Sequence, residues 1–327
     1  MTTGNKFIQS HVLGFPRTTH CTTAVPADGG TLLRARHWAQ QRAAGLDFVT
    51  VGDDSLHDHV AEHGALFGCQ PGLETAPWFD TDYRYQVPTF TADTGFAPAS
   101  ERLFAQVDQA HALGHPVKAV LPGPLTFLWL GQEAGGDAGF SRLDLLDRLL
   151  PAYGAVLDRL KAQGVAWVQI DEPILGLDLP GKWRNAFEAA YWQLNQVGIQ
   201  LLLATYFSPL KENLGLACRL PIAGLHVDGV RAPHELTSIA DWLPVHKVLS
   251  IGMVDGGHGG RTDLDAALDI LAPIVDKRGG KLWVSASCSL LHAPSPASAA
   301  DKLGELARLK QRVLEHALEH AAEPAFA

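Results

Sequence analysis

The sequence has little cysteine, and its cysteines do not form close pairs. Its 327 residues include only Cys21, Cys69, Cys218 and Cys288, with no C-x-x-C motif. This wide spacing excludes a disulfide-stapled scaffold and a zinc ribbon, and it is typical of a protein kept in a reducing compartment. We therefore expect a cytoplasmic protein.

Long apolar runs and an excess of basic residues are also missing. No apolar stretch reaches the roughly 18 residues that a membrane helix needs, and the N-terminus lacks the apolar core of a signal peptide. The net charge is −9, with 26 Lys and Arg against 35 Asp and Glu, which disfavours binding to nucleic acid or an anionic membrane. Neither G-x-G-x-x-G nor G-x-x-x-x-G-K-[ST] occurs, so a nucleotide-binding doubly wound sheet has little support.

What the sequence does contain is an alternation of short apolar runs and helical patterns. The runs, expected to be buried parallel strands, are Phe7–Leu13, Phe48–Val51, Val117–Leu121, Trp167–Ile170, Gln200–Ala204, Ala223–Val227, Val248–Met253 and Leu282–Ala286. The helical patterns are Thr31–Ala44, Ala99–Leu113, Leu143–Gln163, Lys182–Gln196, His234–Trp242, Leu264–Lys277 and Ser298–Ala322. Eight such units predict an α/β fold, a (β/α)8 TIM barrel forming one domain over residues 1–327. We expect Phe67–Gly95, rich in Pro and aromatics, to be an excursion over the barrel mouth.

Polar residues follow the predicted strands, where a barrel of this kind carries its site. In chain order they are Asp53, Asp54, Asp171, Glu172, Tyr206, His226, Asp228, Asp255, His258, Cys288 and His292. Carboxylates gathered in a concave mouth suit a substrate ammonium group or a metal ion, because unpaired they would raise one another's pKa.

Plainer interpretations of these residues stay open. The acidic residues could cap helices, Cys288 could be a small buried hydrophobe, and His226 could be a hydrogen-bonded core histidine. The chain holds 15 histidines, an unusual number. The group His57, His59 and His63 lacks H-E-x-x-H spacing and is predicted to form a solvated helix face. His316 and His320, one turn apart on the last helix, could bind metal adventitiously, but we favour simple surface placement.

Several motifs together resemble a known family. They are LGFPR (13–17), RARHWAQQRAAGLDFVTVGD (34–53), WFDTDYRYQVP (78–88), LPGPLTFLWLG (121–131), WVQIDEPIL (167–175), TYF (205–207), GLHVD (224–228) and SCSLLHAP (287–294). In this order they resemble cobalamin-independent methionine synthase, and within it the N-terminal barrel of that two-barrel enzyme. The resemblance runs from about Ile8 to about Ala317 and implies a (β/α)8 barrel.

The resemblance also implies what the mouth residues do. In the family, the C-terminal barrel, which we expect to be absent here, holds zinc with His, Cys, Glu and Cys and activates homocysteine for methyl transfer from a methyl-tetrahydrofolate. Leu13–Phe15, with Gly14 and Phe15, matches the loop that meets the amino-acid carboxylate. Asp53 and Asp171 match the pair that grips the ammonium.

The zinc set is matched only in part. Asp228 and Cys288 correspond to the Glu and the second Cys, but TYF replaces the H-x-C ligand pair, with Ala204 and Tyr206 near the ligand positions. A closed zinc site would then need His226, His258 or His292 as substitutes.

The folate side is altered as well. The family's tail-binding basic stretch has no Lys or Arg between Thr18 and Leu33, and Pro77 replaces a lysine. Loss of those cations should weaken binding of a polyanionic folate tail.

Three functions are compatible with this pattern. The first is an enzyme of methionine, homocysteine or related thiol metabolism, in the methyltransferase family. Its expected catalytic residues are Asp228, Cys288 and His226, its substrate-binding residues Gly14, Phe15, Asp53, Asp171, Glu172 and Tyr206, and its metal ligands Asp228, Cys288, His226 and His258. The second is a subunit that docks on a separate catalytic barrel through an apolar face around Phe67–Gly95. The third is an amino-acid or folate binding module without turnover; an acyl-transfer nucleophile at Cys288 is a weaker idea.

Overall fold

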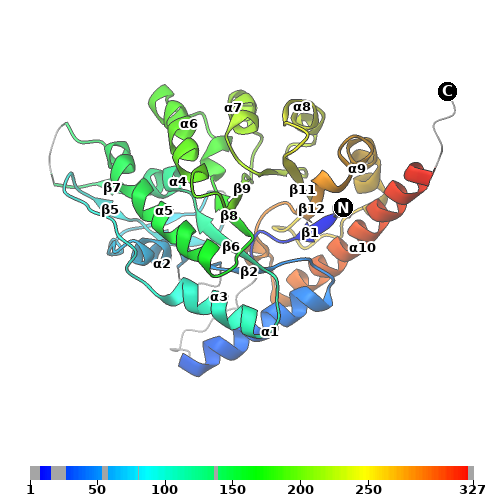
Figure 1. Cartoon of the computed structure of the whole chain (residues 1–327), viewed down its shortest axis with the longest axis horizontal. Helices are drawn as coiled ribbons and strands as arrows, with labels where there is room; N and C mark the ends of the chain where they lie inside the picture. The colour runs from blue at the N-terminus through cyan, green and yellow to red at the C-terminus, as the bar shows by residue number, and fades with distance from the viewer. Residues whose placement is uncertain (1–7, 16–26, 54–57, 80, 136–138, 323–327) are drawn as a thin grey trace.

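A barrel of parallel strands forms the centre of the computed structural model, which describes residues 8–15, 27–53, 58–79, 81–135 and 139–322 (Figure 1). The sheet has the order β1-β12-β11-β10-β9-β8-β6-β2, and all its pairings are parallel. Its strands are β1 (Gln9–His11), β2 (Val49–Val51), β6 (Val117–Pro122), β8 (Trp167–Asp171), β9 (Gln200–Ala204), β10 (Gly224–Asp228), β11 (Val248–Val254) and β12 (Leu282–Ala286). The predicted (β/α)8 barrel is thereby confirmed.

Helices surround the barrel on its outside (Figure 1). They are α1 (Ala27–Ala43), α2 (His59–Leu66), α3 (Arg102–Ala112), α4 (Pro124–Leu130), α5 (Leu146–Ala162), α6 (Gly181–Asn195), α7 (Leu214–Arg219), α8 (Leu236–Trp242), α9 (Leu264–Arg278) and α10 (Pro296–Ala322). Short 3₁₀ turns cover Arg142–Leu145, Pro173–Gly176, Lys211–Asn213, Pro233–Glu235, Gly279–Lys281 and Leu290–His292. Within the described residues, none of these helices is both long and apolar enough to cross a membrane.

The composition of the strands explains why they lie at the centre with helices around them. Strands that are covered on both faces should be apolar at nearly every position. Every residue of β6, β10, β11 and β12 is buried. The helices instead bury one stripe: on α5 the buried side chains include Leu149, Tyr153, Val156 and Leu160, which recur at three- and four-residue steps.

Two small sheets lie outside the barrel. β3 (Thr75–Pro77) and β4 (Arg84–Gln86) pair antiparallel, and β5 (Thr89–Phe90) pairs with β7 (Gln132–Glu133). Strands β3, β4 and β5 lie in the segment 67–95 that was predicted to be an excursion. In that segment Trp78 is buried, and the ring of Phe79 lies 6.0 Å from that of Phe207, which follows barrel strand β9.

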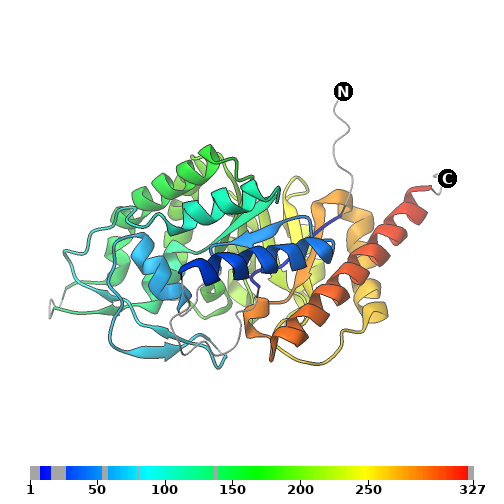
Figure 2. The same ribbon diagram turned by 90° about the horizontal axis from the view of Figure 1, so that it is seen from below.

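The barrel is not fully closed by strand pairing. In the part of the chain that the structure describes, β1 and β2 form the two edges of the sheet, and no ladder joins them. One backbone bond links the edges, from Asp47 N to Ser10 O at 3.1 Å, and the Asp47 carboxylate accepts from Ser10 N at 2.6 Å and from Lys310 Nζ at 2.7 Å. We call this junction the seam; helices α1 and α10 pack against its strands (Figure 2).

The interior of the barrel has an apolar end and a polar layer. Phe48, Leu202, Val248 and Trp283 form a small buried cluster of their own. Next to it, Ser250 Oγ hydrogen-bonds two histidines, His11 at 2.7 Å and His226 at 2.8 Å. The polar layer therefore lies between the apolar end and the mouth, and it connects strands that are not neighbours in the sheet.

One prediction about a helix is wrong. Residues 59–66 do form helix α2, but His63 is not on a solvated face: it is 4% exposed, and its Nε2 lies 2.5 Å from the Tyr153 hydroxyl. His59 is half-buried against the rings of Trp78 and Tyr83. His57 lies outside the described residues. The helix faces the barrel wall rather than solvent, because Phe67 and Phe127 pack against the His63 ring.

Candidate functional site

The loop after β1 and the carboxylate after β2 meet at the barrel mouth. Asp53 Oδ2 accepts hydrogen bonds from Phe15 N and from Thr50 Oγ1, both at 2.8 Å. Gly14 allows this approach, because a Cβ there would lie 2.3 Å from Ser289 Oγ and 3.2 Å from Asp53 Oδ2. A larger residue at position 14 would therefore push the loop away from Asp53 and break the Phe15 N–Asp53 hydrogen bond.

Asp171, at the end of β8, is joined to the same loop through a buried amide. Gln169 Nε2 donates to Asp171 Oδ1 at 2.7 Å and to Leu13 O at 3.0 Å. The Tyr206 hydroxyl donates to Asp171 Oδ2 at 3.2 Å. Burial raises the pKa of Asp171 to about 7, against the opposing effect of these hydrogen bonds and of Lys118.

These groups face a small cavity, which we call the mouth cavity. Its volume is about 30 Å³, and its lining is Leu13, Gly52, Asp53, His59, Trp78, Val120, Pro122, Asp171, Tyr206, Ser289, Leu291 and His292. Two carboxylates, a phenol and apolar walls around one space suit a cationic group on an otherwise apolar ligand. The space now admits only one or two water molecules, so a larger ligand needs the lining to open.

A buried lysine beneath the cavity is a residue that the sequence analysis missed. Lys118, on β6, is completely buried, and its Nζ donates to Val12 O at 2.9 Å, lies 3.0 Å from His11 Nδ1 and contacts Gln169 Oε1. Burial lowers the pKa of Lys118 to about 7, which the charge of Asp171 partly opposes. A lysine inside an otherwise apolar strand run was the signal that could have revealed it.

Glu172 is buried but does not line the mouth cavity. Its Oε2 accepts from Thr126 N at 2.7 Å and from Thr126 Oγ1 at 2.6 Å, and its Oε1 accepts from the Tyr191 hydroxyl at 3.2 Å. The side chain therefore satisfies free N–H groups at the start of α4. The predicted contact between Glu172 and substrate would require these bonds to break.

Asp228 lies on another part of the mouth, where an arginine accompanies it. Its carboxylate accepts from Phe207 N at 3.1 Å, from Val230 N at 3.1 Å and from Arg231 N at 2.9 Å. Arg231 Nη1 lies 3.1 Å from Asp228 Oδ2, in an ion pair that buries the carboxylate. The positive charge next to Asp228 is therefore a guanidinium from its own loop, which the sequence analysis did not consider.

The predicted metal ligands Asp228, Cys288, His226 and His258 do not form one ligand group within the described residues. Cys288 is completely buried, and burial raises the pKa of its thiol to about 12. His226 points into the polar layer of the barrel, and burial lowers its pKa to about 3. The His258 side chain is 74% exposed and pairs with Asp255 at 3.2 Å.

Within the described residues, no three metal-ligating side chains come together at the mouth. One such group lies on the outer helices and consists of Asp276, His316 and His320. The structure thus brings together Gly14, Phe15, Asp53, Asp171 and Tyr206, but not the four expected metal ligands.

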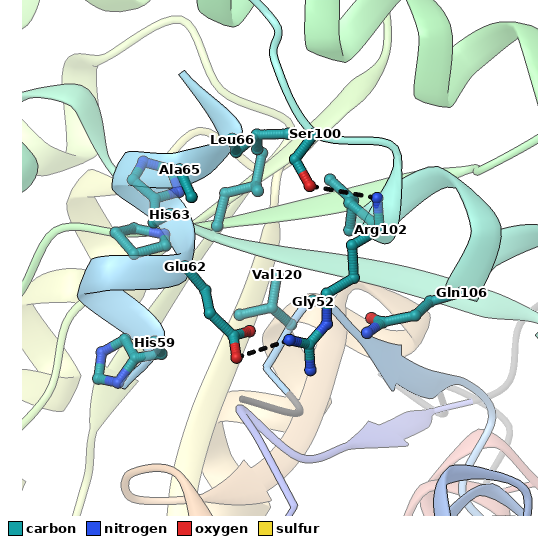
Figure 3. A pocket seen from close by; sticks show the side chains of 13 residues that line it. Gly52, His59, Glu62, His63, Ala65, Leu66, Ser100, Arg102, Gln106 and Val120 are labelled. Carbon is teal, nitrogen blue, oxygen red and sulfur yellow. Dashed lines mark hydrogen bonds and ion pairs between the residues drawn. The ribbon is translucent and has the colours of Figure 1, made fainter. Parts of the chain in front are cut away.

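A larger pocket adjoins the mouth cavity, between α2 and α3 (Figure 3). Its volume is about 250 Å³, and it shares Gly52, His59, Val120 and Pro122 with the mouth cavity. The Glu62 side chain reaches from α2 to Arg102 at the start of α3, with 2.7 Å between Oε1 and Nη1. This side pocket extends the space next to the site along the outer face of β6.

Comparisons with known proteins agree with this fold. A family model described as "Cobalamin-independent synthase, N-terminal domain" matches residues 69–279, more than half of the chain. A B12-independent methionine synthase from Shewanella sp. W3-18-1, solved in complex with selenomethionine, is similar with a TM-score of 0.75 at 15% identity, over 96% of this chain and 98% of that one.

Two further solved structures are similar over most of their length. A putative vitamin-B12-independent methionine synthase from Listeria monocytogenes has a TM-score of 0.69 at 15% identity, over 94% of this chain and 98% of that one. A methyltransferase from Methanosarcina mazei has a TM-score of 0.66 at 13% identity, over 94% of each chain. At these identities the likeness establishes the fold alone.

Proposed function

Because this chain belongs to the family of the cobalamin-independent synthase N-terminal domain, we propose that it binds an amino acid of the methionine or homocysteine type at its mouth and acts in methyl transfer. Its fold is that of methionine-synthase-like proteins.

The observation that carries this proposal is the meeting of Asp53 and Asp171 at one cavity beside the Leu13–Phe15 loop. Lys118 is completely buried, and its charge interacts with both of these carboxylates. A substrate ammonium would add a second positive charge directly at the cavity. Asp171, held by Gln169 and Tyr206, would accept from the ammonium without having to reorient.

The residues present do not fit the zinc that the family resemblance implies. Ala204 and Tyr206 offer no imidazole or thiolate, and the carboxylate of Asp228 is already compensated by Arg231. Within the described residues, no third metal-ligating side chain joins Asp228 and Cys288 in one ligand group. We therefore assign no step of the reaction to a metal at the mouth.

Methyl-tetrahydrofolate stays the proposed methyl donor by resemblance only. The Thr18–Leu33 stretch, which lacks the family's cations, lies partly outside the described residues. Pro77, which replaces a lysine, lies in β3 beside the buried Trp78. We expect a folate with a short glutamate tail to serve as well as one with a long tail.

Calorimetric titration with methionine, homocysteine and N-acetylmethionine tests the amino-acid site. Asp171→Asn keeps the shape but removes the charge, so we expect methionine affinity to fall about 10- to 100-fold, since hydrogen bonds to charged groups contribute about 1.5–3 kcal/mol. The exposed Asp269→Asn is the matched control and should bind as the unmodified protein does. Equal binding of methionine and N-acetylmethionine would refute the ammonium site. Binding without methyl transfer from methyl-tetrahydrofolate would instead support a binding module.

A further inference from the structure

Two histidines and an aspartate meet on the outside of the barrel, where α10 packs against α9 (Figure 1). His316 and His320 are one turn apart on α10, and their rings lie 4.0 Å apart. His316 Nε2 lies 3.1 Å from Asp276 Oδ1 on α9. One ligand atom from each of the three residues lies within 4.8 Å of the others.

The hydrogen bonds of this cluster leave ligand atoms free to bind a metal ion. His320 Nδ1 hydrogen-bonds the His316 backbone oxygen at 3.0 Å, which fixes the ring and directs Nε2 away from its own helix turn. In zinc sites, a histidine that donates one ring N–H to a backbone carbonyl commonly binds the metal through its other ring nitrogen.

Neighbouring cations do not neutralise Asp276. Lys277, the next residue, pairs with Asp241 on α8, and Arg312, one turn before His316, pairs with Asp265. Within the described residues the partner of Asp276 is His316. The aspartate is therefore placed to give its charge to a cation held by the two rings.

We propose that Asp276, His316 and His320 form a zinc site that joins the last turns of α10 to α9. Two imidazoles one turn apart on a helix and a carboxylate from a second helix are a borderline-soft donor set of the kind that zinc prefers to calcium or magnesium. Three protein ligands leave one position of a tetrahedron for water. This site is separate from the mouth and does not depend on the proposed function.

Zinc content distinguishes this site from one at the mouth. Untagged full-length protein is stripped with a chelator, dialysed against micromolar zinc and analysed for bound metal. We expect one zinc per chain, lost in His316→Gln/His320→Gln and strongly reduced in Asp276→Asn. The matched controls, His234→Gln and Asp269→Asn, change exposed residues and should keep it.

Two mouth variants complete the test. Cys288→Ser and Asp228→Asn should keep the zinc. Loss of zinc in these two variants, together with its retention in the His316/His320 and Asp276 variants, would overturn the proposal. Absence of bound zinc in the unmodified protein would overturn it as well. Because a ligand that binds only the folded state raises the melting temperature, zinc should also raise it for the unmodified protein and not for the double histidine variant. Equal far-ultraviolet circular dichroism of all variants without zinc verifies that they fold.

Discussion

Replacing His63 with glutamine should make this protein more resistant to acid. The His63 ring is 4% exposed, and the rings of Phe67 and Phe127 lie 5.0 Å away. The Tyr153 hydroxyl donates to Pro122 O at 2.8 Å, so it accepts from the Nε2–H of a neutral His63. Burial lowers the pKa of His63 from 6.5 to about 3.

The size of the effect comes from the difference between the folded and unfolded chains. Below pH 6.5 the unfolded chain binds a proton at His63 that the folded protein does not, so stability falls as the pH falls. Each pH unit costs about 1.36 kcal/mol, so at pH 4.5 this one group removes about 2.7 kcal/mol. Glutamine can donate to Tyr153 in the same way but does not titrate.

Urea unfolding at pH 7.5, 6.5, 5.5 and 4.5 measures this difference. We expect the free energy of unfolding of His63→Gln, relative to the unmodified protein, to rise by about 2.7 kcal/mol between pH 7.5 and pH 4.5. The buried His11 and His226 are present in both proteins and cancel in the comparison. The exposed His234→Gln serves as control and should leave the pH profile unchanged. Parallel profiles for His63→Gln and the unmodified protein would show that His63 is protonated in the folded state.

Two further changes test contacts on either side of the mouth. Gly123→Ala should destabilise by about 1–3 kcal/mol, because its Cβ would lie 2.1 Å from the buried Glu172 carboxyl group; calorimetric melting checks this, and Gly154→Ala, with open space around it, should not lower the melting temperature. Arg231→Met should lower the free energy of unfolding in urea by about 1–3 kcal/mol, because it leaves the buried Asp228 charge without a cation. The loss stays below that for a fully buried ion pair, because the Arg231 side chain is partly exposed to solvent. An unchanged midpoint would mean that the backbone N–H groups alone compensate Asp228.

The barrel could be predicted from the sequence because its strands are buried on both faces. The runs Gln200–Ala204 and Leu282–Ala286 are strands with those same bounds, and the other six overlap the observed strands. Short helices were harder to find: α4 and α7 were not predicted, and α2 was predicted only as a solvated face carrying His57, His59 and His63. Helices of six to eight residues show too little periodicity, and α4 in particular is buried nearly all round, so it has no polar face to reveal it.

The site could be predicted only in part. The cluster of Asp53, Asp171 and the loop at residues 13–15 followed from strand ends that must meet at one edge of a barrel. The role of Glu172 did not, because the groups it bonds belong to a helix nearly fifty residues earlier in the chain. Lys118 was missed because a single charged residue says nothing about its partners until distant strands are brought together. Arg231 was missed although it lies only three residues after Asp228, because a loop sequence does not show which side chains turn toward each other.

The seam between β1 and β2 affects how a ligand enters and leaves the mouth cavity. The Leu13–Phe15 loop continues from one edge strand and Asp53 from the other, so the loop and the carboxylate that accepts its Phe15 N–H lie on opposite sides of the seam. Because ladder hydrogen bonds are missing there, local opening costs less along this line than between any other two strands. The seam amides should therefore exchange with deuterium sooner than those of β8 to β12, and an amino acid that contacts both the Leu13–Phe15 loop and Asp53 should slow that exchange.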